Sequence, residues 1–294
     1  MSTLHLLDAT FELFRAYFAM PSETAPDGRE VGAIRGLIGS TLALLREPDV
    51  TQIGAATDHV IESFRNQLFA GYKRGDGIPP DLWAQFPFAE DALRALGVVV
   101  WPMIEFEADD ALATAAARFA DAVEQVVILS PDKDLMQCVV GQHVVTYDRV
   151  RQKRYDDSAV RAKFGVEPSS IPDLLALVGD SADGIPGIQG WGMKSTAAVL
   201  SVYRTIDAIP LDAREWRVPL RRAARLAATL AEHRDDARLY KTLATLRTDA
   251  PISPTLAEME WKGVRRDLFL PLCQRCGFGD LASRPTRWDE ESAR

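Results

Sequence analysis

The chain has 294 residues, of which 47% are hydrophobic and 26% charged, so it can bury a substantial core and is not a disordered protein. No run approaches the roughly 18–20 consecutive apolar residues that span a bilayer, and no basic region precedes the apolar residues 4–7, which excludes a signal peptide. Three cysteines do not make a disulfide framework, so we expect a cytoplasmic protein, although a net charge of −8 argues at first against a nucleic-acid partner.

Short β-rich runs alternate with helical patterns in the first half of the chain. We predict strands at 4–7, 52–56, 98–103, 125–129 and 143–147, and helices at 32–46, 89–96 and 108–120. Nearly continuous apolar strands that alternate with helices predict a mostly parallel sheet covered on both faces. After about residue 155 only helical patterns follow, at 169–178, 194–203, 220–232, 235–246 and 264–276. We therefore expect an α/β core over 1–155 and a helical region over 156–294.

Acidic residues follow the predicted strands at the points where the strands end. The set comprises Asp8, Asp58, Glu107, Asp109, Asp110, Asp132, Asp134, Asp180 and Asp183. The carboxyl ends of parallel strands share one edge of a sheet, where open α/β folds bind ligands. A single aspartate there is an ordinary helix cap, but so many carboxylates together repel unless cations neutralise them. The set therefore predicts a site for hard divalent ions such as Mg²⁺, and without these nine charges the chain would carry +1.

A glycine-punctuated turn at 184–192 directly follows Asp180 and Asp183 and lies between two predicted helices, near 170–203. This arrangement resembles a helix-hairpin-helix motif, in which backbone amides and a helix N-terminus hold a phosphate without reading bases. The DNA contacts that we expect here are Gly187, Gly190, Gly192 and Lys194.

The stretch 64–88 interrupts the alternation of strands and helices. It carries Arg65, Lys73 and Arg74 and then a glycine- and proline-rich run at 75–80. Excursions of this length in compact domains are often functional, and a plain surface loop is the alternative interpretation.

Together these residues resemble the bacterial and phage 5′→3′ exonuclease/flap endonuclease family, which includes the N-terminal nuclease domain of DNA polymerase I. The similar stretches are 6–8 with 15–19, 58 with 63–65 and 71–73, 107–110, 132–135 and 179–183, within a match that runs from residue 4 to about 283. The resemblance implies a PIN-like or resolvase-like core and a two-metal phosphodiesterase that acts on 5′ ends and branched duplexes. It also implies that 64–88 forms part of an arch for a 5′ single strand.

The resemblance also implies roles for individual residues and partners. Lys73 would contact the scissile phosphate, with Arg65 as a helper and Arg74 close by on the DNA. Two or more Mg²⁺ ions are implied, with Mn²⁺ as a substitute, and K⁺ at the hairpin. The implied substrates are DNA with 5′ flaps, nicks or branched ends in replication or repair. No polymerase segment follows, so we expect a stand-alone, monomeric nuclease.

The sequence departs from the family pattern in three respects. Ala9 and Thr10 follow the first aspartate, where a Gly-Ser pair is common, and Asp76 stands where the arch commonly carries an arginine. Gly184 stands where an asparagine is common, which predicts a looser hairpin. Two other functions stay open: a catalytically weak DNA-structure binder, which Asp76 and the acidic charge motivate, and an RNase on a related α/β core.

Overall fold

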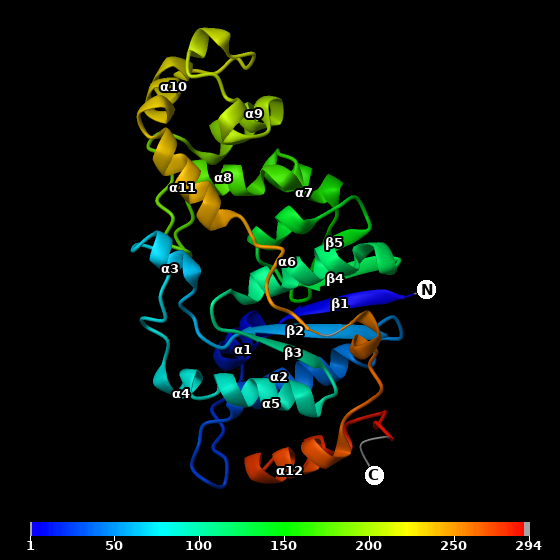
Figure 1. Cartoon of the computed structure of the whole chain (residues 1–294). Helices are drawn as coiled ribbons and strands as arrows, with labels where there is room; N and C mark the ends of the chain where they lie inside the picture. Colours follow the sequence, from blue (N-terminus) through cyan, green and yellow to red (C-terminus); the bar gives the residue numbers. More distant parts are fainter. Residues whose placement is uncertain (1, 254, 291–294) are drawn as a thin grey trace. The chain divides into compact units, whose positions relative to one another are not determined.

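The computed structural model describes residues 2–253 and 255–290, and these form two compact units (Figure 1). Unit 1 comprises the described parts of Met1–Ile61, Gly75–Ser130 and Thr248–Arg294, and unit 2 comprises Glu62–Arg74 and Pro131–Arg247. The excursion 64–88 is therefore shared, since its first part belongs to unit 2 and its second part to unit 1. Among the described residues, no helix combines the length and the apolar character that crossing a bilayer requires.

Unit 1 contains four parallel strands in the spatial order β3-β2-β1-β4. They are β1 (Thr3–Asp8), β2 (Gln52–Asp58), β3 (Val99–Met103) and β4 (Gln125–Leu129). Leu4, Leu6 and Leu7 of the central strand β1 are fully buried, because helices cover both faces of the sheet. The predicted parallel sheet is confirmed.

The helices of unit 1 follow from the order of its strands. The chain runs outward from β1 to β2 and β3 and then returns to β4 on the other side of β1. Because parallel crossovers are right-handed, α6 (Ala108–Phe119) covers the face opposite to α1 (Ala9–Ala19), α2 (Gly32–Leu44) and α5 (Phe86–Ala95). The strand order thus reverses between β1 and β4, which is the position at which open α/β folds bind ligands.

The last residues of the chain return to unit 1. The indole N–H of Trp101 in β3 donates to the Ser253 carbonyl at 2.8 Å, and Arg118 of α6 donates to the Ile252 carbonyl at 2.7 Å. The helix α12 (Arg266–Cys276) then packs against α5. The short helix α4 (Pro80–Trp83) also belongs to this unit.

Unit 2 is mainly helical. Its elements are α3 (Phe64–Leu68), the antiparallel strands β5 (Val144–Asp148) and β6 (Lys153–Tyr155), α7 (Asp157–Phe164), α8 (Ile171–Val178), α9 (Met193–Tyr203), α10 (Ala223–Glu232) and α11 (Arg234–Ala244). The helix α8 lies at the centre of the core, with α11 running alongside it (Figure 1). The ammonium of Lys241 in α11 lies 2.9 Å from the buried carboxylate of Asp173 in α8 and fixes this helix pair.

Several elements lie outside the predictions, among them α3 and α4 within the excursion 64–88. The helix α1 was not expected, although its buried residues Ala9, Glu12, Leu13 and Ala16 have helical spacing. The strand β6 and the helix α7 were also missed, because both are short and largely polar. The predicted absence of strands beyond residue 155 is confirmed for the described residues.

Candidate functional site

Asp8 lies at the point where the strand order reverses. It is the last residue of β1 and the N-cap of α1, and its Oδ1 accepts a hydrogen bond from the Phe11 N–H at 2.9 Å. Its Oδ2 accepts from the hydroxyl of Ser130, directly after β4, at 2.7 Å. The carboxylate therefore joins the carboxyl ends of β1 and β4.

Asp58 and the start of α6 meet at the end of the neighbouring strand. Asp58 ends β2 and accepts a hydrogen bond from the Ala108 N–H at 2.7 Å. Glu107 caps α6, and Asp110 accepts from the Glu107 N–H at 3.0 Å, while Asp109 is half-buried in the same first turn. The positive end of the helix dipole stabilises carboxylates at this position. Each of these acids thus has a capping or near-capping role in addition to any role in metal binding.

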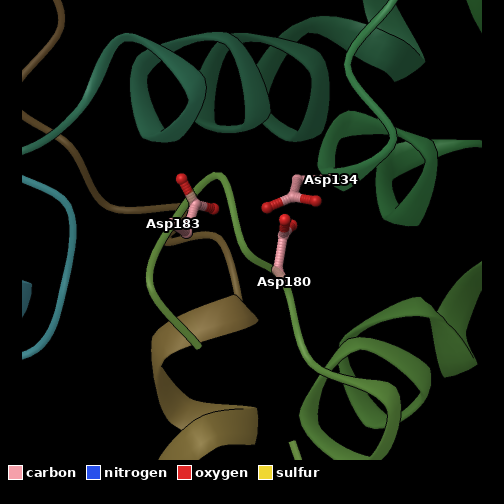
Figure 2. A group of neighbouring side chains, drawn as sticks. All are labelled: Asp134, Asp180 and Asp183. Carbon is pink, nitrogen blue, oxygen red and sulfur yellow. The ribbon is translucent and has the colours of Figure 1, made fainter. Parts of the chain in front are cut away.

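The remaining acids of the predicted set lie in unit 2, where three of them form a cluster. Asp134 begins a short 3₁₀ turn (Asp134–Cys138), and Asp180 and Asp183 follow α8. Figure 2 shows these three side chains pointing toward one another, and one carboxylate oxygen from each lies within 4.8 Å of the others. Asp132, which is exposed, accepts a hydrogen bond from the Asp134 N–H at 2.9 Å. The structure therefore assembles an oxygen-rich group from two separate segments.

The environment of this cluster is unfavourable for negative charge. Asp134 and Asp180 are each only 5% exposed. Burial raises the pKa of Asp134 well above its usual range, and repulsion by Asp132 and Asp183 raises this pKa further. Among the described residues, no group makes a hydrogen bond to Asp134 Oδ1. A buried carboxylate oxygen of this kind suits a hard divalent cation.

Two lysines partly neutralise the cluster. Lys133 forms an ion pair with Asp180, and its Nζ lies 3.7 Å from Asp134 Oδ1. Burial alone would lower the pKa of Lys133, but the neighbouring aspartates reverse this effect and raise it. Lys73 Nζ lies 3.0 Å from Asp183 Oδ1. Lys133 was absent from the predicted site, although it stands between two of the predicted acids in the sequence.

The predicted helix-hairpin-helix consists of α8, the turn and α9. Asp180 and Ile185 exchange two backbone hydrogen bonds, each of 2.8 Å, across the turn. Gly187 has φ 73°, and a Cβ there would lie 2.5 Å from the Gly179 nitrogen, so the two glycines permit a tight crossing of the chain. Gly192 is the N-cap of α9, and the exposed side chain of Lys194 follows in its first turn.

Gly184 tightens the structure here, contrary to the expectation of a looser hairpin. It has φ 74°, and a Cβ at this position would lie 2.1 Å from the Gly71 carbonyl oxygen. The Lys73 N–H donates to the Asp183 carbonyl at 2.9 Å. The missing side chain thus admits residues 71–73 beside the hairpin and brings Lys73 to the acidic cluster.

Arg65 requires a correction. Its side chain is fully buried; Nε donates to the Leu243 carbonyl at 2.8 Å, and a second guanidinium nitrogen donates to the Thr245 carbonyl at 3.1 Å. The guanidinium also lies over the Phe64 ring, 4.6 Å from its centroid. A direct contact with a phosphate requires an accessible guanidinium, so this geometry gives Arg65 the role of joining α3 to the end of α11. Arg74, in contrast, is exposed.

Comparison with known proteins identifies the family. A family profile described as "5'-3' exonuclease, N-terminal resolvase-like domain" matches residues 3–165, and one described as "5'-3' exonuclease, C-terminal SAM fold" matches residues 166–267. The chain belongs to the 5'-3' exonuclease family. The two matched ranges agree with the expected fold, a resolvase-like α/β core followed by a helical region.

Curated relatives agree with this assignment. The 5'-3' exonuclease of Aquifex aeolicus is 33% identical over 210 residues, which cover 71% of this chain and 72% of that protein. The DNA polymerase I of Pseudomonas aeruginosa is 35% identical over 243 residues, which cover 80% of this chain and 26% of the polymerase. The chain thus spans about a quarter of the length of such polymerases.

Solved structures show that the fold is shared at low sequence identity. The T5 D15 protein co-crystallized with metal ions matches with a TM-score of 0.69 and 15% identity, covering 96% of this chain and 100% of that one. The catalytic core of Rad2 in complex with DNA substrate matches with a TM-score of 0.62 and 13% identity, covering 94% and 88%.

The buried position of Arg65 predicts a large effect on stability. Arg65→Ala should lower the free energy of unfolding by about 2–4 kcal/mol, because it leaves two carbonyl groups without donors. The exposed Arg74→Ala should change it by less than about 0.5 kcal/mol. Chemical denaturation of both variants measures the difference, and equal stabilities would show that Arg65 has no structural role.

The close approach at Gly184 predicts a local loosening in a variant. Gly184→Ala should make the Lys73 amide exchange with solvent about tenfold faster or more, because the new Cβ pushes Gly71 away and breaks the bond to Asp183. Gly77→Ala is the control, since Gly77 has φ 91° but open space around it. Hydrogen exchange followed by mass spectrometry reports this amide, and unchanged protection in Gly184→Ala would contradict the explanation.

Proposed function

We propose that the chain is a divalent-metal-dependent 5′→3′ exonuclease and structure-selective flap endonuclease, which hydrolyses DNA phosphodiesters near 5′ ends in replication or repair. The observation that carries the proposal is the buried cluster of Asp134, Asp180 and Asp183 with the Lys73 ammonium at its edge. The family profiles over residues 3–267 support it.

The proposed metal ligands are the nine carboxylates at the strand ends and beside the hairpin. Asp134, Asp180 and Asp183 would hold an ion in unit 2, since their oxygens lie close together and one of them has no hydrogen bond from the described residues. The nine would together bind two or more ions, directly or through water; the other six are Asp8, Asp58, Glu107, Asp109, Asp110 and Asp132. We propose Mg²⁺, with Mn²⁺ as a substitute; a T5 5'-exonuclease structure described with divalent metal ions (zinc) supports such a centre.

The protein residues prepare the site for this chemistry. When bound, the ions lower the pKa of a water and stabilise the departing oxygen. Lys73 would neutralise the charge that develops on the scissile phosphate. Asp183 holds the Lys73 ammonium in the described structure, and the short backbone bond between the two residues fixes its position. Arg65 would act indirectly, by anchoring the segment that leads to Lys73.

The hairpin would hold the substrate through its backbone. The helix α9 begins at the N-cap Gly192 and has 11 residues, so its N-terminus would offer backbone amides and the positive end of a helix dipole to a phosphate. The proposed contacts are Gly187, Gly190, Gly192, Lys194 and Arg74, with K⁺ at the hairpin carbonyls. The Rad2 and GEN1 structures, described as complexes with DNA substrate and Holliday junction DNA, support DNA as the ligand.

The substrates that we propose are DNA with 5′ flaps, nicks or branched ends, cleaved by a monomer. Catalysis would reside in residues 1–155, with 64–88 as the arch, and the grip on the duplex in residues 156–294.

The acidic cluster predicts the effect of removing two carboxylates. Asp132→Ala combined with Asp134→Ala should reduce Mg²⁺-dependent cleavage of a labelled 5′-flap duplex by at least about 10³-fold, or about 4 kcal/mol in the barrier. Asp235→Ala with Asp236→Ala removes two exposed acids from the same unit and should leave cleavage near that of the unaltered protein.

The same assay separates the proposal from its alternatives. It includes flap, nicked and single-stranded RNA substrates, each with Mg²⁺ and with EDTA. Undiminished cleavage by the Asp132/Asp134 variant would rule out the assignment of these ligands. Binding of DNA without turnover would instead indicate a DNA-structure binder, and cleavage of RNA alone an RNase.

The position of Lys133 predicts competition with the metal ion. Its Nζ contacts Asp180 and lies 3.7 Å from Asp134 Oδ1, so an ion in the cluster must displace it. Lys133→Gln should lower Tm in EDTA and tighten Mg²⁺ binding by about tenfold, and Mg²⁺ should then raise Tm by more than in the unaltered protein. Isothermal titration and thermal unfolding measure both effects, with the exposed Lys153→Gln as control. Weaker Mg²⁺ binding by Lys133→Gln would show that the lysine assists the ion.

A further inference from the structure

A strongly basic stretch follows the hairpin in this acidic chain. Residues 216–231 contain four arginines and no aspartate or glutamate, although the whole chain carries a net charge of −8. The arginines are Arg217, Arg221, Arg222 and Arg225, on the loop before α10 and on its first turn. We call these four side chains the arginine face.

The charges of the arginine face are available for a ligand. All four side chains are exposed. Among the described residues, no partner forms an ion pair or a hydrogen bond with any of these four guanidinium groups. Other arginines nearby are engaged: Arg214 pairs with Asp212, and Arg238 pairs with Asp207 at 2.9 Å. Four like charges that repel one another without internal partners indicate a surface for a polyanion.

The segment that carries the arginine face packs against the hairpin. The indole N–H of Trp191, in the hairpin turn, donates to the Leu226 carbonyl in α10 at 3.2 Å. The rings of Trp191 and Trp216 lie 5.9 Å apart. These contacts fix the start of α10 beside the turn, and both belong to unit 2.

A recess joins the two features into one surface. It has a volume of about 660 Å³ and is lined by Gly190, Gly192 and Lys194 from the hairpin side and by Arg221 from the arginine face. Glycine backbone, an ammonium and a guanidinium around one recess match the oxygens of a phosphate group.

We propose that the arginine face extends the hairpin into a longer binding surface for the phosphate backbone of duplex DNA. This inference rests on the proposed function and adds contacts that the helix-hairpin-helix does not include. A duplex presents one negative charge per about 1.7 Å of its axis, so a row of unpaired guanidiniums beside the hairpin meets successive phosphates. The contact reads no bases, and it therefore strengthens binding equally for all sequences.

The test compares two double variants with the same loss of charge. Arg221→Gln with Arg225→Gln removes two charges from the arginine face, and Arg214→Gln with Arg238→Gln removes two paired charges from the same unit. Fluorescence anisotropy measures the Kd for a labelled 5′-flap duplex in EDTA at several salt concentrations. The first variant should bind about tenfold more weakly at 0.1 M salt, and its slope of log K against log salt should fall by about 2. The control should retain the slope of the unaltered protein.

A charge-conserving variant and an RNA duplex test the interpretation further. Arg221→Lys with Arg225→Lys keeps both charges and should keep the salt slope, which excludes unfolding as the cause of weak binding. Equal salt slopes for the Arg221/Arg225 variant and the control would overturn the arginine face. Dependence on Arg221 and Arg225 for an RNA duplex but not for DNA would also overturn it.

Measurements of cleavage distinguish a failure of this inference from a failure of the proposed function. Below saturation and with Mg²⁺, the Arg221/Arg225 variant should cleave the flap about tenfold more slowly, in step with its weaker binding, whereas the Arg214/Arg238 control should cleave at the rate of the unaltered protein. Absence of cleavage by the unaltered protein would refute the proposed nuclease activity. Normal cleavage together with unchanged binding by the variant would refute only the arginine face.

Discussion

Repulsion among buried carboxylates is the constraint on which the rest of unit 2 depends. Asp134, Asp180 and Asp183 come from two segments that are far apart in sequence, and burial strengthens the repulsion between them. The fold can bring them together only because cationic groups arrive at the same place. Lys133 comes from the same turn as Asp134, and Lys73 arrives from a different segment, which Gly184 allows to approach. The geometry of the cluster and the balance of charge within it therefore depend on each other.

The acids of unit 1 show how one side chain can serve both folding and the proposed metal binding. Asp8 caps α1 and accepts a hydrogen bond from Ser130, so it stabilises the junction of β1 and β4. Asp110 closes the first turn of α6. These bonds hold the carboxylates in fixed orientations, which reduces the entropy that ligands lose when they bind an ion. They also mean that replacing such an acid disturbs a helix start as well as the proposed metal site.

The sequence predicted what depends on local pattern and edge geometry, and failed where a distant neighbour decides. Apolar runs located the strands, and Asp8 and Asp58 end two of them as predicted. Nothing near Arg65 in sequence indicates that its partners are the carbonyls of Leu243 and Thr245. Lys133 between two acids has the same pattern whether it faces solvent or the cluster. Gly184 suggested a loose hairpin, because the sequence near it does not show its contact with Gly71, which lies more than a hundred residues earlier.

The contact between Gly184 and Gly71 has a consequence for how this family varies. A side chain at position 184 occupies the space through which residues 71–73 pass, so the two positions are not independent. A relative with asparagine at the position of Gly184 needs a different backbone path at the position of Gly71. Substitutions at these two places should therefore co-vary among homologues, and the position of the lysine that corresponds to Lys73 should shift with them. Evolutionary coupling between the hairpin and residues 71–73 would then reflect a simple limit on volume.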